Sequence, residues 1–216
     1  MNALPVEWPG FVFGDVADDA IKSTQQVSDD SLDDDGAAEI ELPFALGHSD
    51  SPLSVRGSFS LLESGGRPVV RSIERAVWPS PQLIAVRPLF DRNVAPDHGL
   101  ARFELIRVNA NGQFVPLEQA TLKLVREDRQ YYWRFDDQKG WHSGYTETEE
   151  LIESGSVSLK ARTTVSLPVA YGRYRLEVAD PKTGRTLRHR FYAGWGAQDA
   201  DDIGNRPDRV QLQLAK

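Results

Sequence analysis

The sequence contains no cysteine among its 216 residues. This absence excludes a disulfide framework, a thiol nucleophile and a thiolate metal site. Long apolar runs are also missing, since none approaches the roughly 18 residues of a membrane-spanning helix. The first residues, MNALPVEWPG, lack the basic and apolar regions of a signal peptide. On these grounds alone we expect the chain to be either cytosolic or a piece of a longer protein.

Clusters of basic residues are absent as well. The 25 lysines and arginines are spread along the chain, and the 32 acidic residues bring the net charge to −7. A nucleic-acid-binding domain usually concentrates its positive charge in one patch. The sequence therefore predicts no nucleic-acid partner. Its length is sufficient for a hydrophobic core in one large domain or two small ones.

Helical periodicity is nearly missing. Only TETEELIES, at 146–154, begins like a helix, with carboxylates in its first turn, but it has few apolar anchors and is no more than a candidate helix. The other segments alternate apolar and polar residues as strands do. Turn sequences such as NANG (109–112) and DPKTG (180–184) separate them. This pattern predicts an all-β fold, an antiparallel β-sandwich of about seven strands over residues 81–195.

A proline-rich segment, WPSP at 78–81, divides the chain into two units. We expect a smaller β unit at 1–79 and a β-sandwich at 80–216. In the smaller unit, AEIELPFA (38–45) is typical of a half-buried strand, and a hairpin is expected around the Ser-Gly-Gly turn at 64–66. Its inward side chains would be Val55, Phe59, Leu61, Ile73 and Val77.

The acidic stretch before Gly36 partly resembles a calcium loop. Ser31, Asp33 and Asp35 fall at ligating positions, but Leu42 stands where a bidentate glutamate is needed. We expect a solvated loop at 29–35, and calcium binding stays open. The acidic stretch at 196–208 has too few apolar residues to fold alone and is also expected to be a loop.

Histidines and catalytic motifs give little support for an enzyme. The four histidines lack metal-ligand spacing, and the last of them alternates with apolar residues as a partly buried strand histidine would; they are His48, His98, His142 and His189. GWHSGY (140–145) lacks the spacing of a nucleophile elbow, and no glycine-rich phosphate loop is present. We expect no enzyme activity, no cofactor and no metal. The remaining catalytic alternative is a carboxylate pair such as Glu127 and Asp136, one of them desolvated beside a cleft.

The stretch REDRQYYWRFDDQKGWHSGYTE, 126–147, is the densest in aromatic residues. With DDQKG as a turn, strand parity places Tyr131, Trp133 and Phe135 on one side together with Trp141, Ser143 and Tyr145. The other side holds Tyr132, Arg134 and His142, which we predict to be an interaction surface. Two interpretations stay open: one core face plus one ring-covered sheet face, or a platform at 131–145 that binds carbohydrate or peptide.

Several long blocks together resemble the bacterial α2-macroglobulins. They are ESGGRPVVRSIERAVWPSPQLIAVRPLF, LVREDRQYYWRFDDQKGWHSGYTE, YGRYRLEVADPKTGRTLRHRFYAGWG and NRPDRVQLQL, and the likeness extends from about Trp8 onward. The resemblance is to the two macroglobulin-like β-sandwich domains, fibronectin- or immunoglobulin-like, that precede the bait-region domain. It implies the fifth domain at 1–79 and the sixth at 80–216, with 205–216 either an edge strand or the start of the next domain.

The resemblance also implies a function. Members of the family are large cell-envelope inhibitors that trap a protease after it cuts a bait, and these domains form the frame of the trap without chemistry of their own. The expected partners are neighbouring domains of the same chain and, for the full-length protein, target proteases. The expected location is the periplasm, with membrane contact only through a lipid anchor elsewhere in the full-length chain. The family's thioester needs a Cys-Leu-Glu-Gln motif, whereas PLEQ at 116–119 has Pro116 in the nucleophile's place. No catalytic residue is transferred.

Overall fold

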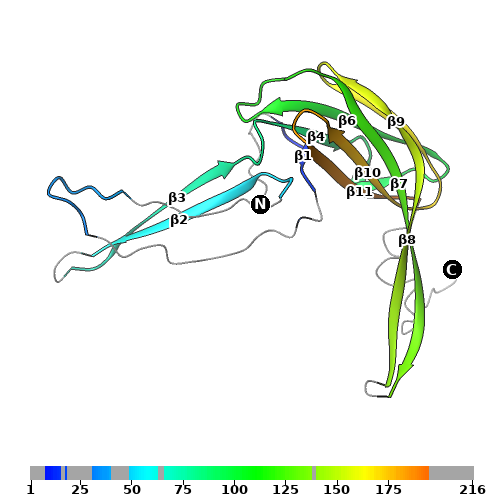
Figure 1. Cartoon of the computed structure of the whole chain (residues 1–216), viewed down its shortest axis with the longest axis horizontal. Coiled ribbons are helices and arrows are strands. Elements are labelled where there is room, and N and C mark those ends of the chain that lie inside the picture. Colours follow the sequence, from blue (N-terminus) through cyan, green and yellow to red (C-terminus); the bar gives the residue numbers. More distant parts are fainter. Residues whose placement is uncertain are drawn as a thin grey trace, which may run out of the picture.

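The computed structural model describes residues 8–15, 18, 31–39, 49–62, 66–137 and 140–194. Two sheets packed face to face form a β-sandwich (Figure 1). One sheet has the strand order β1-β4-β6-β9, and the other β5-β11-β10-β7-β8. The strands are β1 (Val12–Phe13), β4 (Gln82–Pro88), β5 (Val94–Ala95), β6 (Gly99–Asn109), β7 (Leu117–Asp136), β8 (Gly140–Leu159), β9 (Thr163–Val169), β10 (Gly172–Asp180) and β11 (Arg185–Ala193). The predicted all-β sandwich is confirmed.

Alternation along the strands fills the space between the two sheets. β10 and β11 each bury every second residue along most of their length, so that Leu176 and Phe191 lie in the core and their neighbours face outward. The ring of Phe191 contacts those of Phe103 and Tyr174, with centroids 5.1 and 5.6 Å apart. Burial of such rings removes roughly 150–250 Å² each from water and is the main stabilising term of a sandwich core.

Strands β7 and β8 are far longer than the strands around them. Each has 20 residues, and they pair from Leu117 and Leu159 to Asp136 and Gly140. Only the half of the pair that runs from Leu117 and Leu159 to Glu127 and Glu149 belongs to the sandwich, because β10 pairs with β7 no further than Glu127. The second half leaves the sandwich as a two-stranded ribbon (Figure 1). We call residues 128–148 the arm.

The candidate helix at 146–154 does not form, because these residues lie within β8. Glu147 faces Arg129 of β7 at 3.4 Å, and Glu149 binds Arg175 of β10. These partners come from distant parts of the sequence, and such cross-strand contacts outweigh a weak local helix signal. Within the described residues the one helical segment is the 3-10 turn η1 (Asp91–Asn93), and no helix there has the length and hydropathy of a membrane span.

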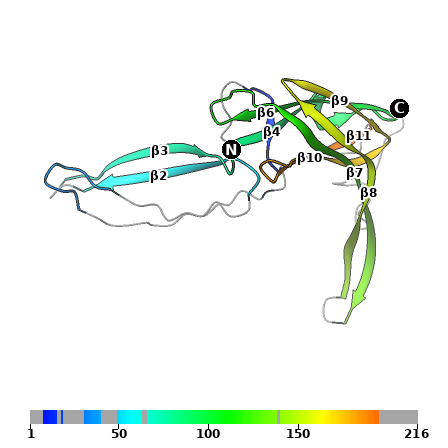
Figure 2. The ribbon, with the colours of Figure 1, turned by 45° about the horizontal axis from the view of Figure 1, so that its top comes forward.

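A second hairpin, β2 (Leu53–Leu61) with β3 (Val69–Val77), extends from another side of the sandwich (Figure 2). The expected hairpin is confirmed, and its predicted apolar side chains do share one face. That face is not covered along its whole length, since Phe59, Leu61 and Ile73 are exposed. Residues 40–48 and 63–65 lie outside the described residues, so the strand expected at 38–45 stays a prediction.

The first described residues pack on the sandwich and not on the β2–β3 hairpin. β1 extends the first sheet by pairing with β4. Trp8, Phe11 and Phe13 cover the outer face of that sheet in a second buried cluster, and Trp78 packs against the same cluster. The chain therefore touches the sandwich both before and after the hairpin. The proposed division at 79/80 stays a prediction.

Candidate functional site

The outer face of the second sheet carries a dense network of charges. Arg173, Arg175 and Glu177 alternate along β10 with buried residues, which turns them away from the core. Glu127 of β7 lies among them and is only 2% exposed. Its carboxylate contacts Arg175, Nε of Arg173 at 3.0 Å and Nε of Arg190 at 3.1 Å. Three guanidinium groups thus neutralise one buried carboxylate.

Arg175 is the centre of this network. It also binds Glu149 of β8 through two bonds, of 2.7 and 2.9 Å, and Glu177 at 2.8 Å. These hydrogen bonds raise the pKa of Arg175 above its ordinary value, and those to Glu149 contribute most. The bonds between Arg175 and Glu149 also lower the pKa of Glu149. The network joins β7, β8, β10 and β11 by charge. Alternation in RYRLE predicts a charged face, but the convergence on Glu127 depends on the strand order.

A second ion pair is buried inside the sandwich. Nε of Arg107 in β6 lies 2.8 Å from Oδ2 of Asp180 in β10, and the side chains are 2% and 1% exposed. Asp180 also accepts the backbone N–H of Lys182 at 2.9 Å and so fixes the β10–β11 turn. The pair joins the two sheets. Sequence reasoning missed it, because LIRV and EVAD give no sign that their charged residues meet.

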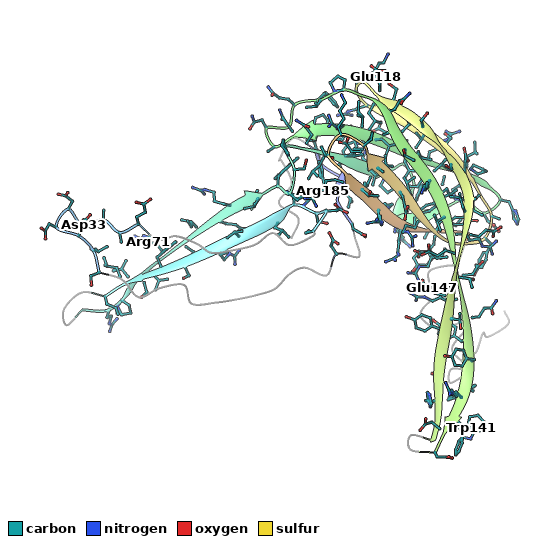
Figure 3. The ribbon with its side chains drawn as sticks, in the orientation of Figure 1. Asp33, Arg71, Glu118, Trp141, Glu147 and Arg185 are labelled. Atoms are coloured by element: carbon teal, nitrogen blue, oxygen red, sulfur yellow. The ribbon has the colours of Figure 1, made fainter. Side chains whose placement is uncertain are left out.

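The arm carries the aromatic residues that the sequence singled out. The predicted turn and parity are confirmed: Tyr131 pairs with Tyr145, and Phe135 with Trp141. The two pairs have ring centroids 5.7 and 5.5 Å apart. Figure 3 shows Trp141 at the tip and Glu147 near the point where the arm leaves the sandwich. The expectation that one of the two faces meets the core is wrong, because rings on both faces of the arm are exposed.

We call the arm side with Tyr131, Trp133, Phe135, Trp141, Ser143 and Tyr145 the aromatic face, and the side with Tyr132, Arg134, His142 and Gly144 the opposite face. The three predicted interaction residues therefore lie together on the opposite face. Nδ1 of His142 lies 3.2 Å from the carbonyl oxygen of Gly140. A Cβ atom added to Gly144 would meet the Tyr132 ring at 2.9 Å, so this ring lies across the glycine backbone.

The carboxylates considered for catalysis are not brought together. Glu127 lies in the charged network, while Asp136 ends β7 nine residues further along the arm, about 30 Å away at the usual rise per residue. A general acid and base must reach one substrate, which these two cannot do.

Two of the histidines are placed by the structure as strand or loop residues. His189 of β11 is buried, as expected, and its Nε2 lies 2.9 Å from Oδ1 of Asn93. Burial lowers the pKa of His189 to about 4, so the side chain is neutral at pH 7. His98 is exposed beside Asp97. His48 lies outside the described residues.

Asp33 uses its carboxylate on its own loop. Oδ1 accepts the backbone N–H groups of Asp35 and Ala37 at 3.0 and 2.8 Å, and Gly36 adopts a φ of 76° to close the turn. Asp29 and Asp30 lie outside the described residues. In the part of the chain that the structure describes, no three His, Asp or Glu side chains gather as a metal site would require.

A polar joint holds the two ends of the smaller unit on β11. Oδ2 of Asp18 accepts the hydroxyls of Ser49 and Ser51 at 3.2 and 3.0 Å. Arg185 donates to the carbonyl oxygens of Ser49 and Pro79, each at 3.1 Å. Figure 3 places Arg185 where the β2–β3 hairpin meets the sandwich.

Two sheets packed face to face around one buried core define the class: this is a β-sandwich. Residues 85–195 match the bacterial macroglobulin domain 6 model, and residues 2–79 match the bacterial alpha-2-macroglobulin MG5 domain model. The chain belongs to the bacterial α2-macroglobulin family.

Relatives and solved structures agree with this assignment. The chain is 42% identical over 214 residues to alpha-2-macroglobulin of Xylella fastidiosa (strain 9a5c) and 36% identical over 226 residues to that of Escherichia coli K12. The native conformation of the E. coli protein superposes with a TM-score of 0.74 at 34% identity, covering 98% of this chain and 14% of that one. Salmonella alpha-2-macroglobulin reacted with methylamine gives 0.73 at 32% identity, with 98% and 14% covered. Each of these two sequence matches covers 96% of this chain. The chain spans only 13% of the length of the Xylella fastidiosa protein and 14% of the length of the E. coli protein.

Proposed function

We propose that this chain is a framework segment of a bacterial α2-macroglobulin, a broad-spectrum protease inhibitor of the periplasm that traps proteases after bait cleavage. In this proposal the segment is non-catalytic, and any thioester or membrane anchor belongs to other parts of the full-length protein. The observation that carries it is the use of the buried charges: Glu127, Arg107 and Asp180 are all engaged in ion pairs that join strands. Removal of one partner from such a buried pair destabilises the fold, and groups held in this way are not free for proton transfer.

The relatives support the protease part of the proposal. One structure that this chain resembles, with a TM-score of 0.69 and 35% identity, is E. coli alpha-2-macroglobulin activated by porcine elastase. Because the matched segments cover most of this chain but a small share of each relative, the inhibitory activity would belong to the whole protein and not to this segment.

Elastase provides the direct test. We expect the 216-residue chain to leave elastase activity unchanged and to form no adduct that survives denaturing electrophoresis, whereas the whole protein inhibits cleavage of a large substrate. The matched variant is Arg107→Met in the whole protein, which should lower its melting temperature without changing how the folded fraction traps elastase. Inhibition or covalent capture by the short chain would overturn the non-catalytic assignment. Failure of the whole protein to inhibit elastase would overturn the proposed protease trapping.

A second candidate is a binding platform for carbohydrate or peptide at 131–145, favoured by the exposed rings of the arm. Tryptophan fluorescence of the 216-residue chain titrated with a glycan and peptide panel tests it. Binding should be lost in Tyr132→Ala and His142→Ala if the opposite face is the site, and in Phe135→Ala and Tyr145→Ala, which keep the reporting indoles, if it is the aromatic face. No quenching by any ligand would remove this candidate.

A further inference from the structure

The arm exposes several large aromatic side chains on one face. Four side chains of the aromatic face are 44 to 69% exposed: Trp133, Phe135, Trp141 and Tyr145. The arm is two strands wide, so no third strand or second sheet shields these rings in the described residues. Two-stranded ribbons alone are marginally stable in water, and contiguous exposed apolar patches mark interaction sites.

We propose that the aromatic face of the arm docks onto an apolar surface of another domain of the same long chain. The inference rests on the proposed function, because it requires the full-length protein. The docking residues lie on the aromatic face and are Trp133, Phe135, Trp141 and Tyr145. The sequence alone favoured the opposite face, with Tyr132, Arg134 and His142.

Contacts within the hairpin favour the aromatic face. On the opposite face, Tyr132 packs over Gly144 and His142 lies against the carbonyl oxygen of Gly140, so both side chains are partly engaged by the hairpin itself. On the aromatic face, Phe135 and Trp141 contact each other edge to face and leave their outer surfaces free. Trp133 lies opposite Ser143, whose small side chain leaves the indole accessible.

Charge limits the patch to the part of the arm that lies beyond Arg129 and Glu147. Toward the sandwich, the same face carries Arg129, which pairs with Glu147 at 3.4 Å and lies over the Tyr145 ring at 4.9 Å. Beyond it comes the charged network around Glu127. A polar border beside an apolar centre is the usual anatomy of a protein interface. The partner surface is therefore expected to be apolar, with hydrogen-bond acceptors for the two indole N–H groups.

The size of the patch distinguishes a tethered partner from a second copy. The exposed parts of the four rings amount to roughly 500 Å², which is less than the roughly 800 Å² per partner of a stable complex between separate proteins. A tethered domain needs less area, because its effective concentration is in the millimolar range. The relatives supply such domains, since this chain spans only 13 to 14% of their length.

Thiol labelling tests the docking directly. The chain has no cysteine, so Ser143→Cys places a single thiol on the aromatic face without removing a ring, and Arg134→Cys places a matched one on the opposite face. In the 216-residue chain we expect similar maleimide labelling rates for both thiols. In the whole protein, with labelling read at each site by peptide mapping, the Ser143→Cys thiol should react at least about tenfold more slowly while the Arg134→Cys rate changes by less than about twofold.

Three outcomes would overturn the proposal. The first is an equal reaction rate of the Ser143→Cys thiol in both proteins, and the second is protection of the Arg134→Cys thiol instead. The third is protection in the short chain that grows with its concentration, which would make a second copy the occupant. Protease trapping by the whole protein is measured separately. A protein that traps elastase but leaves the Ser143→Cys thiol unprotected refutes the docking alone, whereas protection without trapping refutes the proposed function alone.

Discussion

The two halves of the β7–β8 pair are both antiparallel and have very different surroundings. The inner half, up to Glu127 and Glu149, has β10 beside it and the other sheet beneath it. In the part of the chain that the structure describes, the outer half, the arm, has neither. Both halves alternate their side chains, yet only the inner half uses this alternation to separate core from surface. Alternation therefore sorts residues into two faces, while the neighbouring elements decide whether either face is buried.

The largest difference in lost stability is expected between removing the carboxylate of Glu127 and removing that of Glu147. Their ion pairs lie at neighbouring positions on one face of the β7–β8 pair. Glu127→Gln leaves three arginines around a site without its carboxylate and should lower the free energy of unfolding by roughly 3 kcal/mol or more. Glu147→Gln, which breaks the pair with Arg129 on the arm, should cost less than about 1 kcal/mol. Urea unfolding of the two variants and the parent chain measures both. Equal losses would mean that the arm is as constrained as the sandwich.

Apolar truncation repeats the comparison without charge. Leu124 is fully buried in the inner half, so Leu124→Ala should cost about 2–5 kcal/mol through lost burial and a cavity. Trp133 lies on the same strand but is exposed, and Trp133→Ala should cost less than about 1 kcal/mol in the 216-residue chain. A loss above about 2 kcal/mol for Trp133→Ala would show that its ring is already covered in this chain.

Acid should weaken the sandwich through His189. Its pKa is lowered from 6.5 to about 4 in the folded protein, so the unfolded chain binds an additional proton between these pH values. Stability from this group is complete above pH 6.5 and is lost as the pH falls toward 4, by up to about 3 kcal/mol. His189→Gln should remove that part of the pH dependence, as urea unfolding at several pH values would measure. An unchanged slope would contradict it.

The smallest effect is expected on the opposite face of the arm. Gly144→Ala places a methyl group against the Tyr132 ring, which must shift, and should cost about 1 kcal/mol or less because that ring is exposed. Near-ultraviolet circular dichroism should report the displaced tyrosine. A matched control is Gly155→Ala, where an added Cβ meets no atom within 4 Å.

Sequence reasoning recovered the parts of the fold that depend on local pattern. The alternation of Leu176 and Phe191 and the pairing of Phe135 with Trp141 follow from parity and turns. The family followed from the long blocks of similar residues. The failures concern tertiary partners: Glu149 sits in a strand because Arg175 meets it there, and no local pattern tells that the sandwich ends at Glu127. The location and the 79/80 division stay predictions.

The way in which the chain is anchored on the first sheet determines what a backbone break would do to the molecule. Residues 8–15 and Trp78 share one buried cluster, and the Phe13 and Trp78 rings lie 5.5 Å apart. The β2–β3 hairpin between them extends away from the sandwich, and the chain is anchored at the same cluster on both sides of it. A backbone break between residues 15 and 78 would therefore produce two fragments that stay associated through the first sheet, and a nicked molecule would keep its sandwich complete.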